Sequence, residues 1–218
     1  MVIFDCNGVL VDSESLATSI VSQELMRAGF ALTPDIVARY FTGRRPADMF
    51  AEIEKAAGRK LPADFAATVM KETLRRFRSE LRAIQHMTHA LSWLRGPKCV
   101  ASSSSHERIR VSLESTDLIR FFEPYLFSAN DVKNGKPAPD LLLHVCARTG
   151  VRPADCIVVE DSAVGVAAGV AAGMTAIGFA GGSHAGIQLA GQLRKAGARV
   201  VISDMRALKS TIIDLRGW

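Results

Sequence analysis

The sequence predicts an α/β protein with a doubly wound parallel sheet and one inserted, all-helical segment. Three observations support this prediction. Short apolar runs recur along the chain, stretches with helical periodicity lie between them, and the first two runs are separated by a long interval without a strand pattern. Strands that alternate with helices favour a parallel sheet, because parallel neighbours need a crossover connection.

The apolar runs are the predicted strands. They lie at residues 2–4, 99–101, 125–127, 156–159, 175–179 and 199–202. Helical periodicity covers residues 108–118, 141–149 and 188–195, which lie between them. We therefore expect a Rossmann-like core in which helices cover both faces of the sheet.

The long interval after the first strand is predicted to be entirely helical. Helical segments lie near 14–28, 33–41, 46–57 and 62–82, and Gly29, Gly43 and Gly58 follow the first three as stops. We expect residues 14–84 to form a helical cap, and residues 1–13 and 85–218 to form the core. The cap interval holds 12 Lys and Arg against 9 Asp and Glu, so it carries more than its share of positive charge.

The composition is that of a globular protein. The chain has 218 residues, of which 48% are hydrophobic and 22% charged, so it can bury a core, and disorder, collagen and coiled coil are poor interpretations. The net charge of +5 is compatible with nucleic acid, an anionic membrane or small anions as partners. With two Trp and two Tyr, the chain offers few stacking platforms for single-stranded nucleic acid, which we therefore do not expect as a partner.

One stretch imitates a membrane span, because residues 162–193 contain no Asp, Glu, Lys or Arg. The stretch is rich in Gly and Ala, which insert weakly, and Gly173 is typical of a residue that ends a helix before a strand. We therefore expect a buried helix and strand and no membrane partner.

The cysteines and the N-terminus indicate the compartment. Cys99, Cys146 and Cys156 lie in apolar runs, and no two of the four cysteines form a CxxC pair, so we expect buried thiols in a reducing compartment. No basic region followed by a long apolar core is visible at the N-terminus, so we expect a cytoplasmic protein.

Polar residues follow four of the predicted strands. Asp5 follows the first, four serines at 102–105 follow the second, Lys136 lies after the third, and Glu160 and Asp161 follow the fourth. Ligands of open parallel sheets bind at the carboxyl ends of the strands. Three carboxylates and a lysine at one edge need a bound cation and an anionic ligand to coexist without severe repulsion.

Each of these motifs has an ordinary alternative. Asn7-Gly8 suits a hairpin turn, Ser104 and Glu107 have the spacing of a helix capping box, and Lys136 could be an exposed lysine. A capped helix N-terminus beside hydroxyl groups is also a phosphate site. Four such motifs in order, at successive strand ends, are much less expected by chance than any one of them.

With these four motifs the sequence resembles the haloacid dehalogenase superfamily, a group of mainly magnesium-dependent phosphohydrolases. It looks most like the subfamily of β-phosphoglucomutase and phosphoglycolate phosphatase, in which a helical cap follows the first strand. The resemblance covers nearly the whole chain. It implies that Asp5 is the nucleophile that forms an aspartyl phosphate, that Ser102 and the Ser103 amide bind the phosphoryl oxygens, and that Lys136 neutralises the nucleophile and the phosphate.

The same resemblance implies a Mg²⁺ cofactor. Asp5, Asp161 and the backbone carbonyl of Asn7 would hold the ion, with Glu160 as a further ligand or a supporting acid. Anionic oxygens approach a carboxylate only where cations cancel charge, and the same cations stabilise the transition state.

Asn7 departs from the family pattern. Phosphatases and mutases of this family carry a second Asp there, which protonates the leaving group and later activates water. An amide does neither. We expect slow turnover of esters with poor leaving groups, because general acid–base catalysis contributes about 10²–10⁴-fold. The sequence leaves open whether Asn7 is a natural feature, a deliberate change or an inactivating mutation.

The cap departs from the mutase pattern as well. Near Ala17 the mutase has a histidine, and its cap arginine has no aligned match, although Arg44 and Arg45 lie within one or two positions. We take Arg44, Arg45 and Arg75 as candidates for binding substrate, with a solvated helix face as the ordinary alternative. His106, His144 and His184 have no partner that suggests metal or triad chemistry.

The sequence thus predicts a magnesium-dependent phosphohydrolase that acts on a small phosphorylated metabolite. One alternative is a phosphomutase similar to β-phosphoglucomutase. Another is a catalytically impaired protein that binds a phosphorylated ligand. The oligomeric state is open, and we expect a monomer.

Overall fold

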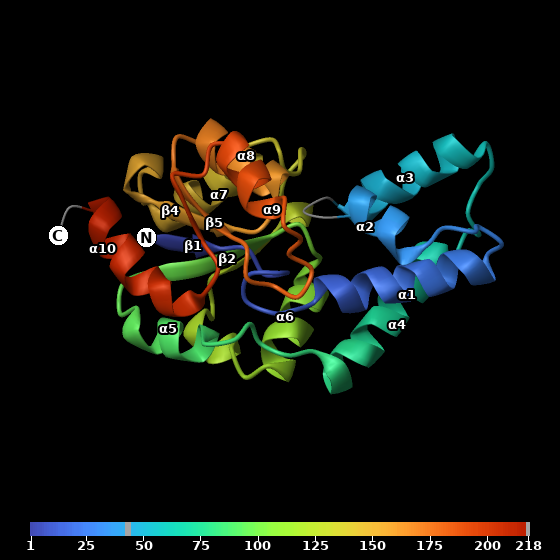
Figure 1. Cartoon of the computed structure of the whole chain (residues 1–218), viewed down its shortest axis with the longest axis horizontal. Helices are drawn as coiled ribbons and strands as arrows, with labels where there is room; N and C mark the ends of the chain where they lie inside the picture. Colours follow the sequence, from blue (N-terminus) through green and yellow to red (C-terminus); the bar gives the residue numbers. More distant parts are fainter. Residues whose placement is uncertain (42–44, 217–218) are drawn as a thin grey trace.

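A six-stranded parallel sheet forms the centre of the molecule. The computed structural model describes residues 1–41 and 45–216. The strands lie in the order β3-β2-β1-β4-β5-β6 (Figure 1). They are β1 (Val2–Phe4), β2 (Lys98–Ser102), β3 (Leu126–Ser128), β4 (Ile157–Glu160), β5 (Thr175–Phe179) and β6 (Val200–Ile202). The Rossmann-like α/β fold predicted from the sequence is confirmed, and each predicted apolar run overlaps one of these strands.

Helices cover both faces of the sheet. Alternate side chains of a strand point to opposite faces, so Val2 and Phe4 belong to one hydrophobic cluster while Ile3 belongs to another. The first cluster receives side chains of α5 (Met87–Trp93), α6 (His106–Ser115) and α10 (Leu208–Arg216). The second receives side chains of α7 (Asp140–Thr149), α8 (Ala163–Ala171) and α9 (Leu189–Lys195).

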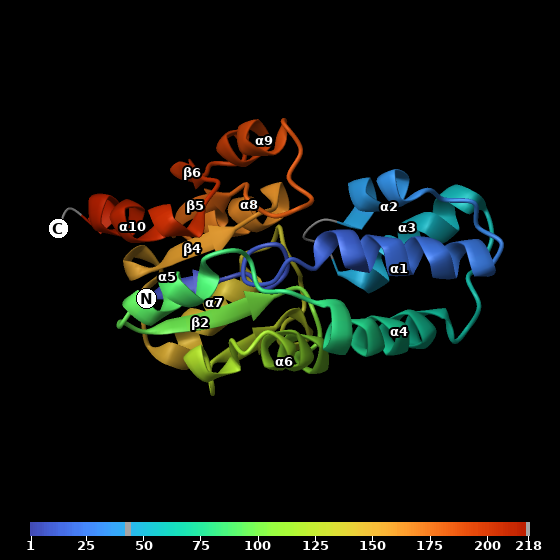
Figure 2. The same ribbon diagram turned by 60° about the horizontal axis from the view of Figure 1, so that its bottom comes forward.

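Four further helices extend beyond one end of the sheet (Figures 1 and 2). They are α1 (Glu14–Arg27), α2 (Pro34–Phe41), α3 (Pro46–Ala57) and α4 (Phe65–Glu80). These helices share a small core of their own that includes Leu25, Phe50 and Phe65. Ala17 of α1 and Phe77 of α4 join the cluster under the sheet, so the same helices also pack against the core.

Several local predictions can be compared with the described residues. Gly29 and Gly58 follow α1 and α3 with φ of 80° and 64°, as expected of glycines that end helices, whereas Gly43 lies outside the described residues. Gly173, with φ of 76°, lies between α8 and β5 as predicted. The helix after β2 begins one residue later than the capping-box spacing indicated, because the Ser105 side chain accepts the hydrogen bond from the Arg108 amide.

The structure can also be compared with the predictions about a membrane span and the cysteines. Among the described residues, no helix is both long and apolar enough to cross a membrane. All four cysteines are buried and free, as expected, although the Sγ atoms of Cys146 and Cys156 lie 3.9 Å apart.

The strand order places a crevice beside β1. The chain leaves β1 toward β2 and β3 on one side, and β4 to β6 continue the sheet on the other, so the strand order reverses between β1 and β4. Ligands of doubly wound sheets bind at the carboxyl ends of the strands at such a reversal. Asp5 and Asp161 directly follow these two strands and therefore lie at this crevice.

Candidate active site at the carboxyl edge of the sheet

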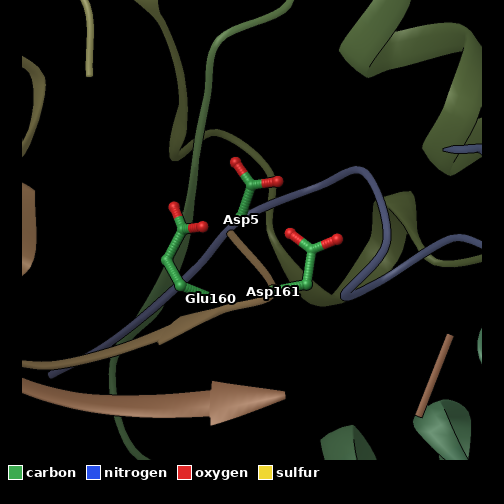
Figure 3. Close-up of side chains that lie close together, drawn as sticks. All are labelled: Asp5, Glu160 and Asp161. Carbon is green, nitrogen blue, oxygen red and sulfur yellow. The ribbon is translucent and has the colours of Figure 1, made fainter. Parts of the chain in front are cut away.

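Three buried carboxylates converge at the ends of β1 and β4. Asp5, Glu160 and Asp161 each offer an oxygen atom, and these atoms lie within 4.8 Å of one another (Figure 3). The backbone amide of Asp5 donates to the carbonyl of Val159 at 3.0 Å, which continues the β1–β4 pairing one residue past the strand. Sheet register thus brings together residues that are far apart in the sequence.

Lys136 supplies the positive charge of the cluster. Its Nζ donates to Asp5 Oδ1 at 2.7 Å, to the Ala101 carbonyl at 3.1 Å, and to Glu160 Oε1. The side chains of Lys136 and Glu160 are each 1% exposed. Burial disfavours the ammonium form, but the adjacent carboxylates of Asp5 and Glu160 outweigh it and raise the pKa of Lys136.

The carboxylates remain short of positive charge. Burial, reinforced by the Asp161 carboxylate, raises the pKa of Asp5 despite the contact with Lys136. Burial also raises the pKa of Glu160 to about 8, with added repulsion from Asp5 and Asp161. Lys136 therefore does not fully compensate Asp5 and Glu160 in this buried place, and the group beside Asp161 is His184, whose Nε2 lies 2.9 Å from Oδ2.

The site fits a hard divalent cation on three grounds. Its donors are carboxylate oxygens, which Mg²⁺ prefers. Asp161 Oδ2 is buried, and its neighbour His184 Nε2 lies 2.9 Å away without the geometry of a hydrogen bond. Finally, the carboxylates are seated against backbone without side chains: a Cβ on Gly8 would lie 1.8 Å from Asp161 Oδ2, and one on Gly165 would lie 2.0 Å from Glu160 Oε2.

The serines after β2 line a cavity beside Asp5. Ser102 is fully buried, and its Oγ accepts a hydrogen bond from the Ser104 amide at 3.3 Å. The cavity has a volume of about 40 Å³, and its walls include Asp5, Ser102, Ser103 and Asp161. Because α6 begins directly after these serines, its N-terminus faces the same region and favours an anion there.

Asn7 also lines this cavity. Its Nδ2 donates to Ser104 Oγ at 2.9 Å, while its Oδ1 is buried without a hydrogen-bond partner among the described residues. Position 7 thus lies on the wall of the same cavity as Asp5 and carries an amide.

The helical insertion closes the cavity on its other side. Glu14, Ala17 and Thr18 of α1 and Pro46 of α3 are among its walls. The carboxyl edge of the sheet and the helical insertion therefore meet at this cavity, and Asp5 is one of its walls.

Comparison with known proteins agrees with this geometry. A family model described as haloacid dehalogenase-like hydrolase matches residues 1–173. The chain belongs to the haloacid dehalogenase-like hydrolases.

Relatives cover most of the chain. A 6-phosphogluconate phosphatase of Escherichia coli is 32% identical over 184 residues, which are 84% of this chain and 83% of the relative. The structure is similar to a haloacid dehalogenase-like protein from Agrobacterium tumefaciens, with a TM-score of 0.84, 36% identity and coverage of 99% and 98% of the two chains. It is also similar to a family hydrolase from Deinococcus radiodurans that was solved with bound phosphate and sodium, with a TM-score of 0.76, 29% identity and coverage of 98% and 94%.

The cap arginines predicted for this hydrolase lie in different places. Arg45 donates from its guanidinium to the carbonyls of Ala129, Val132 and Lys133, in the segment that leads to Lys136. Arg75 is exposed on α4, where Nε donates to Glu72 Oε2 at 2.8 Å, and it is not a wall of the cavity. Arg44 lies outside the described residues.

Three residues at the site were not predicted from the sequence. Glu14 and Arg108 line the cavity, and His184 Nε2 lies 2.9 Å from Asp161 Oδ2. The prediction that His184 has no relevant partner was therefore wrong, because a loop far along the chain brings it to the carboxylate cluster. The position of Glu14 directly after the first motif was a usable signal, whereas nothing in the sequence near Arg108 or His184 indicated the site.

The burial of Glu14 predicts a pH dependence of stability. Burial, with repulsion from Asp161, raises the pKa of Glu14 from 4.5 to about 7, although Arg108 opposes this. Glu14 then binds its proton more tightly in the folded protein than in the unfolded chain. Its ionisation therefore lowers the free energy of unfolding as the pH rises from about 5 to 8. In a chelating buffer, Glu14→Gln should remove that loss. Between pH 5 and pH 8, the free energy of unfolding of the variant should therefore rise by about 2 kcal/mol relative to that of the wild type.

Urea unfolding at the two pH values measures this difference. Glu107→Gln on exposed α6 is the matched control and should follow the wild-type curve. If Glu14→Gln follows it as well, the assignment of a raised pKa to Glu14 is wrong.

Proposed function

We propose that this hydrolase is a magnesium-dependent phosphatase that acts on a small phosphorylated metabolite through an aspartyl phosphate on Asp5. The observation that carries the proposal is the buried contact of Asp5 with Lys136 beside Glu160 and Asp161. An Asp held by a lysine at a carboxylate cluster suits attack on phosphorus, because the cations of the site let an anionic ester approach.

The roles of the residues follow from their positions. One carboxylate oxygen of Asp5 bonds to phosphorus, and the bond from phosphorus to the leaving oxygen breaks. Ser102, Ser103 and the N-terminus of α6 bind the phosphoryl oxygens, and Lys136 offsets their charge. Asp5, Glu160, Asp161 and the Asn7 carbonyl would hold Mg²⁺, which when bound supplies charge stabilisation to the phosphoryl group.

Residues 14–84 act as a cap in this proposal, over a core formed by residues 1–13 and 85–218. The walls of the cavity come from both parts. Because the cavity lies between the two parts, we expect the cap to move when substrate enters. The hydrogen bonds from Arg45 to the Ala129 and Val132 carbonyls are contacts that such a movement would break.

A phosphatase is favoured over a phosphomutase by Ala17. This residue lines the cavity at the place where the mutase carries its cap histidine, and a methyl group transfers no proton. The metabolite is proposed as a phosphorylated sugar or sugar derivative, because relatives named for such substrates align over most of the chain.

The first test uses an activated ester. An aryl phosphate such as 4-nitrophenyl phosphate has a leaving group that needs no acid, so Asn7 should permit transfer of its phosphoryl group to Asp5 in the presence of Mg²⁺, measured as release of 4-nitrophenol. Later turnovers should be slower, because an amide does not activate water. Asp5→Asn should lower the rate of 4-nitrophenol release by about 10³-fold or more, because the amide is not a nucleophile.

The control for this test is Asp117→Asn, the same change at an exposed residue, which should keep the wild-type rate. Hydrolysis that persists in Asp5→Asn or in excess chelator would refute the proposed mechanism. If no aryl phosphate releases its phenol, even in a first turnover, but phosphorylated ligands still bind, the protein is a binding protein.

The second test restores a carboxylate at position 7. In the first turnover, Asn7→Asp should raise the rate of leaving-group release from alkyl phosphates by about 10²-fold or more, and that from aryl phosphates far less, because only the alkoxide leaving group needs a proton. The Ser104 hydroxyl, which now accepts from Asn7, can donate to the new carboxylate instead. Equal gains on both ester classes would contradict the role assigned to position 7.

A further inference from the structure

The wall of the cavity contains a cation that the proposed reaction does not use. Arg108 lies in the first turn of α6, and of the described residues that line the cavity it is the one basic residue. Lys136 and the N-terminus of α6 already serve the phosphoryl group in the proposed function. Arg108 is therefore available for another part of the substrate.

The guanidinium of Arg108 has an unused donor. Its Nε is buried and donates no hydrogen bond to a described residue. The carboxylate whose charge acts most strongly on Arg108 is that of Glu14, on the wall of the same cavity. Its Cζ lies 5.1 Å from the centre of the Phe77 ring of α4, so an aromatic face from the cap packs against the guanidinium. Burial lowers the pKa of Arg108, as expected of a charge without full compensation.

We propose that Arg108 binds a carboxylate of the substrate, so that the substrate class is a phosphate monoester that carries a second anionic group. This inference rests on the proposed function, since it says which residue of the same site binds the part of the substrate other than the phosphoryl group. A guanidinium with an unused buried N–H donor can bind an anion in addition to the nearby Glu14 carboxylate, and the substrate would supply that anion when the cap closes.

The chemistry of the guanidinium favours a carboxylate over a hydroxyl group. Its planar N–H groups match two carboxylate oxygens, and such bonds between charged groups are about twice as strong as those between neutral ones. A neutral polyol would accept single hydrogen bonds but would bring no negative charge to the guanidinium. The packing on Phe77 restricts the side chain in advance, which reduces the entropy lost on binding.

Two esters that differ in one group test this inference. Gluconate 6-phosphate and glucitol 6-phosphate have the same chain length, but the first ends in a carboxylate and the second in a hydroxymethyl group. Both are used as competitive inhibitors of aryl phosphate hydrolysis, so the test does not depend on their own turnover. The wild-type protein should bind the acid ester about 10- to 100-fold more tightly than the polyol ester.

Arg108→Gln should reduce this ratio of inhibition constants to about threefold or less, since a neutral amide replaces the charged fork. Arg108→Lys keeps the charge without the fork, so its ratio should be intermediate, and it serves where Arg108→Gln does not fold. Arg110→Gln is the matched control: Arg110 lies on the same helix, exposed and paired with Glu123, and its removal should leave the wild-type ratio unchanged.

Two outcomes overturn the inference. One is equal inhibition by both esters in the wild-type protein. The other is an equal loss of affinity for both esters in Arg108→Gln, which would assign Arg108 to the phosphoryl group. If the uninhibited protein hydrolyses no aryl phosphate, the proposed function has failed, and calorimetric titration with the same two esters still decides the role of Arg108.

Discussion

The contact of Lys136 with Asp5 and Glu160 is the interaction on which the rest of the site depends. It puts an ammonium group between two carboxylates at a depth where water does not screen them. Removing one member of such a buried group leaves its partners uncompensated, which costs about 3–5 kcal/mol. The segment after β3 must therefore return to the end of β1, and the fold and the site constrain each other.

The same carboxylates constrain the backbone around them. Gly8 and Gly165 pass so close to Asp161 and Glu160 that a methyl group at either position would collide with a carboxyl group. Gly8 also has φ of 72°, which a residue with a side chain rarely adopts. These glycines leave room for carboxylates whose negative charge is not fully compensated, and a divalent cation would supply the positive charge.

The sequence predicted the parts of the site that follow strands. Asp5, Lys136, Glu160 and Asp161 could be found because the carboxyl ends of parallel strands meet at one edge, whatever the packing of the side chains. Arg108 could not be found, because a charged residue at helical spacing is typical of a solvated face, and the packing of Phe77 of α4 beside its guanidinium is not visible in the sequence. The position of the helix cap within the serines at 102–105 depends on loop geometry that four identical residues do not encode.

Asn7 makes the central claim directly measurable. An aryl phosphate should transfer its phosphoryl group to Asp5 without help from an acid. Breakdown of the aspartyl phosphate, however, needs a base to activate water, and the amide of Asn7 cannot act as a base. The covalent intermediate should therefore accumulate. The measurement is mass spectrometry of the acid-quenched protein after mixing with Mg²⁺ and an aryl phosphate. We expect one phosphoryl group on the peptide that contains Asp5, and none after Asp5→Asn. Release of phosphate while Asp5 stays unmodified, or a phosphoryl group on another residue, would contradict the account.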